Sequence, residues 1–235
     1  MAVKYADKII VLSKSMQKYF KDTYGKDTIY IPNGVAKAKP EKPNIVHNKY
    51  GLKYQDYILF VGRVVPEKGI QYLIEAFKLL KKQGKTGGNK LVLAGCSSDT
   101  DYYFWKLKKS ANNEKDIIFT GFVEGTELAE LYSNAYLYVQ PSDLEGMPLS
   151  LLEAMSFGRA CLVSDIPENL ETVNNTGLIF KHSSVEDLAK QFDKLISDSE
   201  LVQKLGKQSK QYCDLNYNWD TTCEKTLKLY ESLLA

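Results

Sequence analysis

Hydrophobic and polar residues follow two spacings along this chain, and segments with one spacing alternate with segments with the other. Short runs rich in β-branched and aromatic residues are each followed by a longer stretch whose apolar residues lie three and four positions apart. The short runs are typical of buried strands and the longer stretches of amphipathic helices. Strands that alternate with helices predict an α/β fold, in which a doubly wound, Rossmann-like parallel sheet is covered by helices.

The same spacings predict where each element begins and ends. Strands are expected at residues 57–62, 90–95, 117–121, 136–140, 160–164 and 178–180. Helices are expected at residues 70–82, 102–111, 127–133, 149–157, 185–197, 200–213 and 219–234. Three of the strands end on glycine, at Gly62, Gly95 and Gly121, which lets a ligand approach the backbone at the carboxyl edge of the sheet.

The first 34 residues do not continue the regular alternation of strands and helices. Two short apolar runs flank a helical stretch that begins after Ser13, and Pro32-Asn33-Gly34 is a strong turn signal. One strand–helix–strand unit cannot bury a core by itself. We therefore expect these residues to be the end of a preceding domain, and their apolar run at residues 9–12 to favour self-association as an exposed strand.

This division of the chain gives four expected units. They are residues 1–34 as the remnant of an N-terminal domain, 35–48 as a polar linker rich in Lys and Pro, 49–215 as the Rossmann-like domain, and 216–235 as a helix that crosses back towards the N-terminal domain. The last helix carries an apolar stripe that needs a surface to cover it. The stripe consists of Trp219, Cys223, Leu227, Tyr230 and Leu234.

Composition narrows the classes of partner. The 31 basic and 29 acidic residues leave a net charge of +2, which gives no reason to expect nucleic acid as a partner. No apolar stretch reaches transmembrane length and the N-terminus lacks a signal-peptide pattern. Four scattered cysteines favour a reducing, cytoplasmic compartment. Peripheral contact with the inner face of the membrane stays open for a longer parent protein.

Zinc chemistry is not expected either. The four cysteines, Cys96, Cys161, Cys213 and Cys223, show no Cys-x-x-Cys spacing, and the chain has only two histidines. Because a zinc site needs several such ligands close together, the cysteines are interpreted as reduced, small core residues.

Two basic residues follow the first strand of the predicted sheet. Arg63 and Lys68 lie five positions apart between Gly62 and Gly69. A guanidinium offers phosphate a two-pronged hydrogen bond, and an ammonium offers a mobile charge. The glycines on either side favour a ligand-binding loop over a solvated surface pair.

Two acidic residues lie eight positions apart near the fourth strand. Glu145 precedes a Gly-Met-Pro turn, and Glu153 lies between one and two turns into the helix that follows. The two oxygens of Glu153 can accept hydrogen bonds from a vicinal diol. The pair therefore suits a ligand with sugar-like hydroxyls.

The start of the same helix can bind an anion. Pro148 suits the first turn of a helix, because its missing N–H is one that the helix would not use. The amides of Met147, Leu149 and Ser150, together with the helix dipole, form an anion site that could do the work of a metal.

With these residues in place, the chain resembles the C-terminal half of the family 4 glycosyltransferases, the retaining, nucleotide-sugar-dependent group with a GT-B fold. Residues 29–35 resemble the end of that family's N-terminal domain, 60–69 its phosphate-binding loop and 157–165 the strand after its acidic motif, while Glu145 and Glu153 reproduce its E-x7-E motif. The resemblance covers nearly the whole chain in the expected order. One departure, a Gly-Met-Pro turn in place of the Gly-Phe-Gly often found there, leaves both glutamates in place.

The resemblance implies an activity. The whole protein would transfer a sugar from a UDP- or GDP-sugar, with retention, to a glycan, a lipid-linked sugar or another hydroxyl acceptor, as in polysaccharide biosynthesis. The leaving phosphate would help to deprotonate the acceptor, and neither a metal nor a cofactor would be needed. Residues 1–235 alone are expected to bind a nucleoside diphosphate without transferring sugar, because the acceptor site would belong to the preceding domain.

The resemblance also assigns roles. Arg63, Lys68 and Glu145 would be the catalytic residues, the first two stabilising the leaving phosphate and the third lying near the donor sugar. Glu153 would hold the ribose. The expected nucleotide-binding residues are Gly62, Val123, Met147, Pro148, Leu149, Ser150 and Glu153.

Two local assignments stay open. Phe122 and Val123 follow the third strand, where they would either meet the base or fill the core. Asp99-Thr100-Asp101 spells the D-x-D that binds a metal–nucleotide in a different glycosyltransferase fold. Its place before an aromatic helix favours helix capping instead.

Rival functions predict different behaviour. A non-catalytic nucleotide- or sugar-binding module would bind but never transfer, and a GT-B-like UDP-sugar epimerase would need no acceptor. A two-carboxylate glycosidase would explain neither the basic loop nor the parallel sheet. A receiver-like signalling domain would need acidic residues at the strand ends, where this chain has Gly62 and Arg63.

Overall fold

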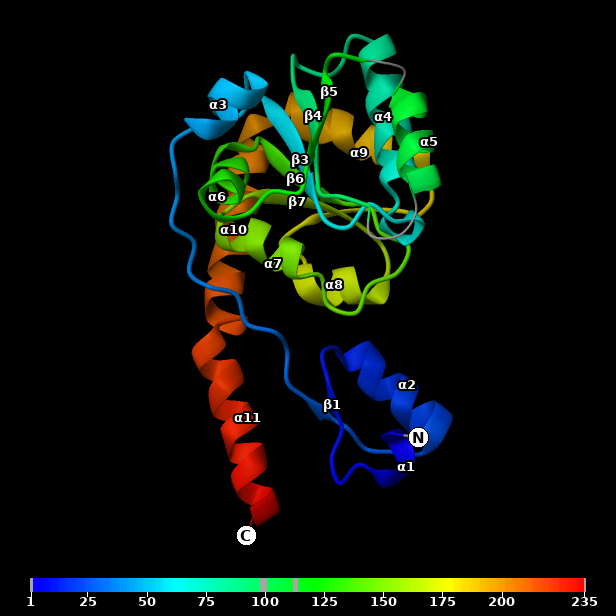
Figure 1. Ribbon diagram of the computed structural model, residues 1–235, viewed down its shortest axis with the longest axis vertical. Coiled ribbons are helices and arrows are strands. Elements are labelled where there is room, and N and C mark those ends of the chain that lie inside the picture. The colour runs from blue at the N-terminus through cyan, green and yellow to red at the C-terminus, as the bar shows by residue number, and fades with distance from the viewer. Residues whose placement is uncertain (1, 98–100, 112–113, 235) are drawn as a thin grey trace.

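The computed structural model describes residues 2–97, 101–111 and 114–234 of the chain. Within these ranges a large parallel sheet forms the centre of a main body, and a small parallel sheet lies near the N-terminus. Figure 1 shows the main body at the top, with the N-terminal segment and the last helix beneath it. The predicted α/β, doubly wound fold is confirmed.

The strand order of the large sheet creates a crevice. Within the described ranges its strands are β3 (Tyr57–Val61), β4 (Lys90–Ala94), β5 (Ile117–Gly121), β6 (Leu137–Gln140), β7 (Ala160–Ser164) and β8 (Leu178–Phe180). They lie in the order β5-β4-β3-β6-β7-β8, and every neighbouring pair is parallel. The chain moves outward from β3 to β5 and then returns to β6. Ligands of such sheets bind outside the carboxyl ends of the strands where the order reverses, here between β3 and β6.

Helices cover both faces of this sheet. One face packs against α4 (Ile70–Lys82), α5 (Asp101–Ala111) and α9 (Val185–Ser197). The other packs against α3 (Ile45–Tyr50), α6 (Gly125–Asn134) and α7 (Leu149–Ser156), and α10 (Ser199–Asn216) contributes residues to both cores. The remaining helical elements outside the N-terminal segment are η1 (Pro66–Lys68) after β3, α8 (Pro167–Val173) after β7 and α11 (Trp219–Leu234).

Strand β3 shows why the sheet is central. Its residues alternate between the two faces: Ile58 and Phe60 belong to the core under α4 and α9, and Tyr57 and Leu59 to the core under α6 and α7. All four are fully buried. A strand buried on both faces has a continuous apolar sequence, which is the pattern of a parallel sheet sandwiched by helices.

The N-terminal segment folds as a small unit of its own elements. These are α1 (Ala2–Tyr5), β1 (Ile10–Val11), α2 (Lys14–Tyr24) and β2 (Ile29–Tyr30). As predicted, Ser13 caps its helix, with its hydroxyl accepting from Met16 N–H at 3.2 Å. The unit contacts α8 of the main body, where the Lys14 N–H lies 2.9 Å from both carboxylate oxygens of Glu171.

Two short α-helices of the main body differ from the sequence prediction. α3 occupies the end of the stretch predicted to be a linker, and α8 lies where no helix was predicted. Both are under eight residues long, and in α3 only Val46 is buried, so neither has a periodic stripe to reveal it. The residues before α3 are extended and bound to the main body, as where Ala38 N–H donates to the Ser156 hydroxyl at 3.0 Å.

Several large apolar residues are exposed on α11 and in the N-terminal segment. On α11 the predicted stripe is uncovered, since Trp219, Leu227 and Tyr230 are about half exposed. In the N-terminal segment Ile10 and Leu12 are also exposed, and self-association through them stays a prediction. No helix in the described ranges is both long and apolar enough to cross a membrane.

The cysteine prediction is only partly right. Cys161 and Cys213 are buried and packed in the core, as expected of small apolar residues. Cys96 and Cys223 are exposed, because the first follows the end of β4 and the second lies on the uncovered α11.

Candidate functional site

The loop after β3 and the loop after β6 meet where the strand order reverses. η1 ends at Gly69, whose φ of +66° lies in the left-handed region. A Cβ at Gly69 would lie 2.0 Å from the carbonyl oxygen of Pro141, so only glycine permits this approach of the two backbones. Asp143 N–H also donates to the Glu67 carbonyl at 2.9 Å. The first loop is thereby held against the second, which carries Glu145.

A charged pair closes the contact between these loops. Lys68 Nζ lies 2.6 Å from Glu145 Oε1, and the two side chains are only 15% and 5% exposed. The same oxygen accepts from Gln140 Nε2 at 2.5 Å and from the Ser142 hydroxyl at 2.7 Å. Three donors on one oxygen compensate for the burial of this carboxylate and fix its orientation.

A buried tyrosine supports the pair from behind. Tyr138, on β6, is fully buried, and its hydroxyl lies 2.5 Å from Gln140 Oε1 and 3.0 Å from the Ser150 hydroxyl. Burial holds the pKa of Tyr138 well above its ordinary value, so the phenol stays neutral and can donate. By accepting at its carbonyl, Gln140 is turned so that its amide nitrogen points at Glu145.

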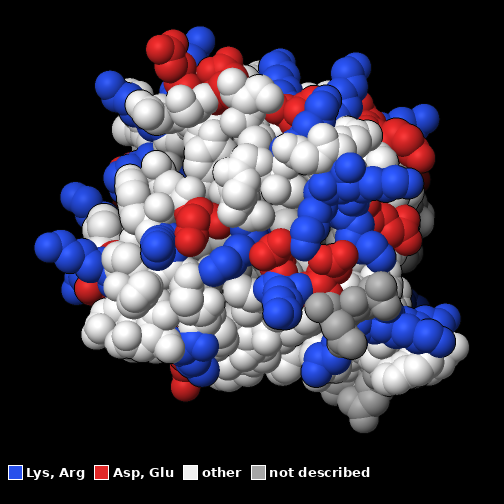
Figure 2. Space-filling view, turned by 90° about the horizontal axis from the view of Figure 1, so that it is seen from above, with Lys and Arg blue, Asp and Glu red and all other residues white. Residues whose placement is uncertain are grey.

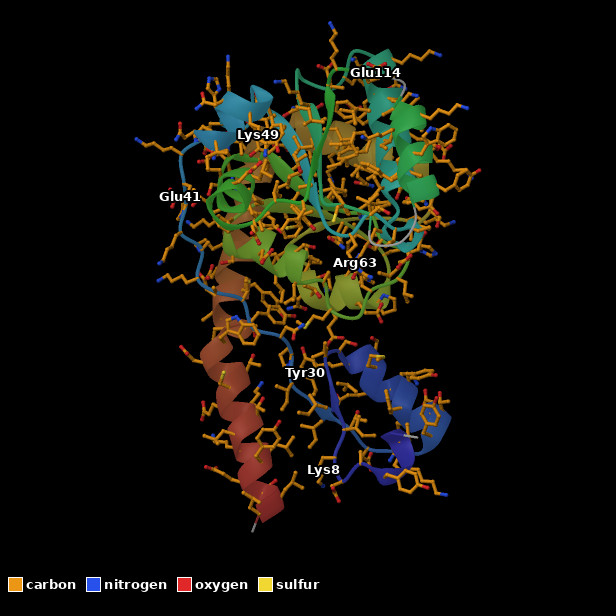
Figure 3. The ribbon with its side chains drawn as sticks, in the orientation of Figure 1. Lys8, Tyr30, Glu41, Lys49, Arg63 and Glu114 are labelled. Carbon is orange, nitrogen blue, oxygen red and sulfur yellow. The ribbon has the colours of Figure 1, made fainter. Side chains whose placement is uncertain are left out.

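Arg63 lies on the same loop as Lys68, but its side chain has different surroundings. Its side chain is exposed and makes no hydrogen bond or ion pair with any residue in the described ranges. Figure 3 shows it at the lower edge of the main body, on the side of the N-terminal segment. An uncompensated guanidinium at the carboxyl edge of the sheet is available for an anion.

Helix α7 begins beside this edge. Pro148 is its N-cap, one position earlier than the first-turn place predicted, and the helix starts at Leu149. The N–H groups of Leu149 and Ser150 open the helix, where no earlier helical carbonyl can accept them. The sulfur of Met147, on the preceding turn, accepts from Asn33 N–H at 3.2 Å, which ties the turn to the N-terminal segment.

Glu153 projects from α7 towards α6. One of its oxygens accepts from the Tyr132 hydroxyl at 2.8 Å, and Tyr132 in turn stacks on Phe157 with ring centroids 5.5 Å apart. Burial raises the pKa of Glu153 even though the hydrogen bond from Tyr132 opposes the shift. The predicted use of both oxygens by a ligand is therefore limited, since one oxygen already has a protein donor.

A cavity of about 520 Å³ opens at Glu153. Its other walls come from the extended residues before α3 and from the start of α6, where Gly125, Thr126 and Leu128 line it. The volume falls within the range of small-molecule sites, and the walls combine apolar surface with a few polar groups.

The remaining site predictions have different outcomes. Gly62 lies at the end of β3 beside Gly95, where a Cβ on Gly95 would meet the Gly62 carbonyl oxygen at 1.8 Å. The Val123 side chain is buried in the core, whereas Phe122 is 68% exposed, so an apolar wall at this point would come from Phe122. Of the D-x-D triplet, the first two residues lie outside the described ranges.

Sequence reasoning missed the polar residues that support the two glutamates. Tyr138 and Gln140 lie in a predicted strand, Tyr132 lies in a predicted helix and Ser142 follows the strand, and their spacing assigns none of them to the site. A glutamine at the end of a buried apolar strand is the one signal that was available, because a buried amide must find partners.

Comparison with known proteins agrees with this geometry. A sequence model of the family described as "Glycosyl transferases group 1" matches residues 44–212. The chain is 30% identical over 208 residues to "O-antigen chain mannosyltransferase B" of Escherichia coli, covering 87% of this chain and 52% of that protein. It is 26% identical over 199 residues to "N,N'-diacetylbacillosaminyl-diphospho-undecaprenol alpha-1,3-N-acetylgalactosaminyltransferase" of Campylobacter jejuni, covering 84% and 50%. The chain thus spans about half the length of these curated relatives.

Solved structures share the fold. HepE from Anabaena, crystallised with UDP and glucose, superimposes with a TM-score of 0.87 at 19% identity, covering 98% of this chain and 65% of that one. Sucrose-phosphate synthase from Thermosynechococcus elongatus gives 0.85 at 24% identity, covering 99% and 59%. These structures agree with the match of the family model to most of the chain, and that match establishes that the chain belongs to the group 1 glycosyl transferases.

Proposed function

We propose that this chain binds a nucleotide-sugar donor, a UDP- or GDP-sugar, in the crevice between β3 and β6. The observation that carries the proposal is the meeting of Lys68 with Glu145 at the point where the strand order reverses. Arg63 and the start of α7 lie at the same edge. A nucleotide sugar fits this arrangement, because its phosphate groups can bind the cations and its sugar hydroxyls can donate to the carboxylate of Glu145.

Each group has a role that follows from its charge. Departure of the nucleoside diphosphate builds negative charge on a phosphate oxygen, which Arg63, Lys68 and the amides of Leu149 and Ser150 would stabilise. These fixed positive groups are the reason for expecting no metal. Glu153 would accept a hydrogen bond from the ribose with the oxygen that Tyr132 does not use.

For the whole protein we propose transfer of a hexose with retention. The bond between the anomeric carbon and the phosphate oxygen breaks, an acceptor oxygen bonds to the same face of that carbon, and the acceptor proton passes to the leaving phosphate. Glu145 would contact the donor sugar near that carbon. The names of two relatives, an O-antigen mannosyltransferase and a transferase to a diphospho-undecaprenol sugar, support a glycan or lipid-linked acceptor.

Calorimetry with UDP, GDP and ADP tests donor binding. Binding of UDP or GDP that Arg63→Ala weakens about 10-fold or more, with unchanged folding, would support the proposal. Lys207→Ala removes an exposed positive charge from α10 and serves as the control. Failure of all three nucleotides to bind, or equal loss in both variants, would contradict it.

A second assay separates transfer from its rivals. The whole protein is incubated with UDP- and GDP-sugars, with and without a hydroxyl acceptor. Release of the nucleotide that depends on the acceptor indicates a transferase. Conversion of the donor sugar without an acceptor indicates an epimerase, and binding without either reaction indicates a non-catalytic module.

A further inference from the structure

Helix α5 has one side that the core uses and one that it does not. Leu107 is buried against the sheet, and the Tyr103 hydroxyl donates to the side chain of Gln71 on α4. On the other side Tyr102, Trp105, Lys106 and Lys109 are all exposed. Their spacing of three and four positions places these four on a single side of the helix, called here the α5 face.

The α5 face is organised internally. The Tyr102 and Trp105 rings stack with centroids 6.2 Å apart and planes inclined by 15°. Lys106 Nζ lies 4.5 Å from the centre of the Tyr102 ring, and Lys109 Nζ lies 5.0 Å from the centre of the Trp105 ring. The rings are nevertheless 67% and 54% exposed, which leaves a large apolar area in water beside two cations.

We propose that the α5 face docks on a membrane surface rich in anionic phospholipid. Tyr and Trp favour the boundary between headgroups and acyl chains, because their rings are apolar at one end and polar at the other. Lysines flanking them can bury their methylene stems and keep the ammonium at headgroup level. Rings and cations side by side can both be accommodated at headgroup level, and the charge of the face is complementary to an anionic surface.

The surroundings of the α5 face extend the positive charge. Lys108, on the flank of α5, is exposed, as is Lys82 at the end of α4. Lys81 forms ion pairs with both Glu114 and Asp116, each at 2.6 Å, so these three residues together carry one negative charge that offsets one of the lysines. Towards the right of Figure 2, on the side where Figure 1 has α4 and α5, Lys and Arg side chains gather with some Asp and Glu side chains among them.

The α5 face begins on the same edge of the sheet as the candidate site. α5 follows β4, so its first turn with Tyr102 begins at the carboxyl edge of the sheet. The crevice between β3 and β6 opens at this same edge. Docking through the α5 face would therefore bring the candidate site close to the lipid surface, although the proposal does not rest on what that site does.

Single-stranded nucleic acid is the other partner that combines cations with exposed rings. It is recognised by stacking bases on free aromatic faces. In the α5 face the two rings already stack on each other and each has an ammonium over it, so a base would have to displace these contacts, whereas a lipid surface can meet the rings and ammonium groups as they stand. The geometry therefore favours lipid.

The fluorescence of Trp105 tests the proposal directly. Trp105 and Trp219 are the two tryptophans of the chain, so Trp219→Phe makes Trp105 the single reporter. Its emission is expected to shift to the blue with vesicles of phosphatidylcholine and phosphatidylglycerol, and to stay unchanged with phosphatidylcholine alone. High salt should weaken the partition, because it screens the lysines.

Vesicle co-sedimentation then separates charge from rings. Lys106→Gln with Lys109→Gln is expected to weaken partition roughly 30-fold, which is about fivefold for each lysine near the surface. Tyr102→Ala with Trp105→Ala should also abolish most of the binding. Lys204→Gln with Lys207→Gln removes the same charge from the exposed side of α10 and should change partition less than about twofold.

Three results would overturn the proposal. One is an unshifted Trp105 emission with anionic vesicles. Another is an equal loss of partition in the α10 control variant. The third is a stronger response of Trp105 to an oligothymidylate than to anionic vesicles, which would assign the α5 face to nucleic acid.

Discussion

Lys68 Nζ and Glu145 Oε1 lie 2.6 Å apart although 77 positions separate the two residues in the chain. One belongs to the loop after β3 and the other to the loop after β6, so the pair joins the strands between which the sheet reverses its order. Gln140 and Ser142 complete the surroundings of the carboxylate. The contact links the two halves of the sheet at the candidate donor site.

Loss of the lysine should destabilise the fold. Lys68→Met leaves a buried carboxylate with only two neutral donors, and we expect the free energy of unfolding in urea to fall by about 3 kcal/mol. Glu145→Gln in the same chain removes the unpaired charge and should restore part of that loss. Strictly additive effects of the two substitutions would contradict an energetic coupling between these residues.

The close approach at Gly69 gives a prediction with an internal control. Gly69→Ala introduces a Cβ that would meet a backbone oxygen at 2.0 Å, whereas Gly25→Ala, at almost the same φ, has nothing within 4 Å. Gly25→Ala should cost only the left-handed conformation, about 1 kcal/mol. Gly69→Ala should cost about 3 kcal/mol or more and weaken nucleotide binding as well. Equal melting temperatures for the two variants would show that the loops can separate freely.

Ionised Glu153 is expected to lower the stability of the fold and to strengthen nucleotide binding. Because burial raises its pKa, its ionised form costs stability, and this cost grows as the pH rises through the ordinary range of a glutamate to the raised value. Glu153→Gln should therefore raise the melting temperature at neutral pH and change it little in strong acid. The same variant should bind nucleotide roughly 10-fold more weakly, by loss of a charge-assisted hydrogen bond.

The pH dependence of binding follows from the same shift. If ionised Glu153 holds the ribose, the affinity for nucleotide should decline on acidification from a pH above the ordinary glutamate range. Calorimetry across a pH series measures this decline. A Glu153→Gln variant with the same decline would assign the pH dependence to another group.

The cysteines should divide into two reactivity classes. Cys96 and Cys223 are exposed and should react with a thiol reagent in the native protein. Burial raises the pKa of the Cys213 thiol to about 12 and that of Cys161 further, so these two should react only after unfolding. Native reaction of all four thiols would show that the core under α7 and α10 opens readily.

The sequence was sufficient for elements with long, regular apolar spacing. Helices α4, α9 and α11 have the predicted bounds, since each spans several turns and keeps one spacing throughout. α3 and α8 were missed because a helix of one or two turns has too few positions to show a period. α7 starts at the predicted residue, Leu149, and ends at Ser156, one residue before the predicted end, which is the usual uncertainty of a helix end.

The candidate site was predictable residue by residue but not as a set of contacts. Arg63, Lys68, Glu145 and Glu153 stand out by residue type and spacing. That Lys68 would pair with Glu145, or that Tyr132 would occupy one oxygen of Glu153, depends on the strand order and on helix packing. Spacing within one segment carries no information about such contacts between segments.

The most direct test of the account is a crystal structure of this chain with UDP or GDP. We predict the diphosphate between the side chains of Arg63 and Lys68 and the first amides of α7, with a ribose hydroxyl donating to Glu153. A nucleotide bound elsewhere on the protein, with these groups free of it, would contradict the account.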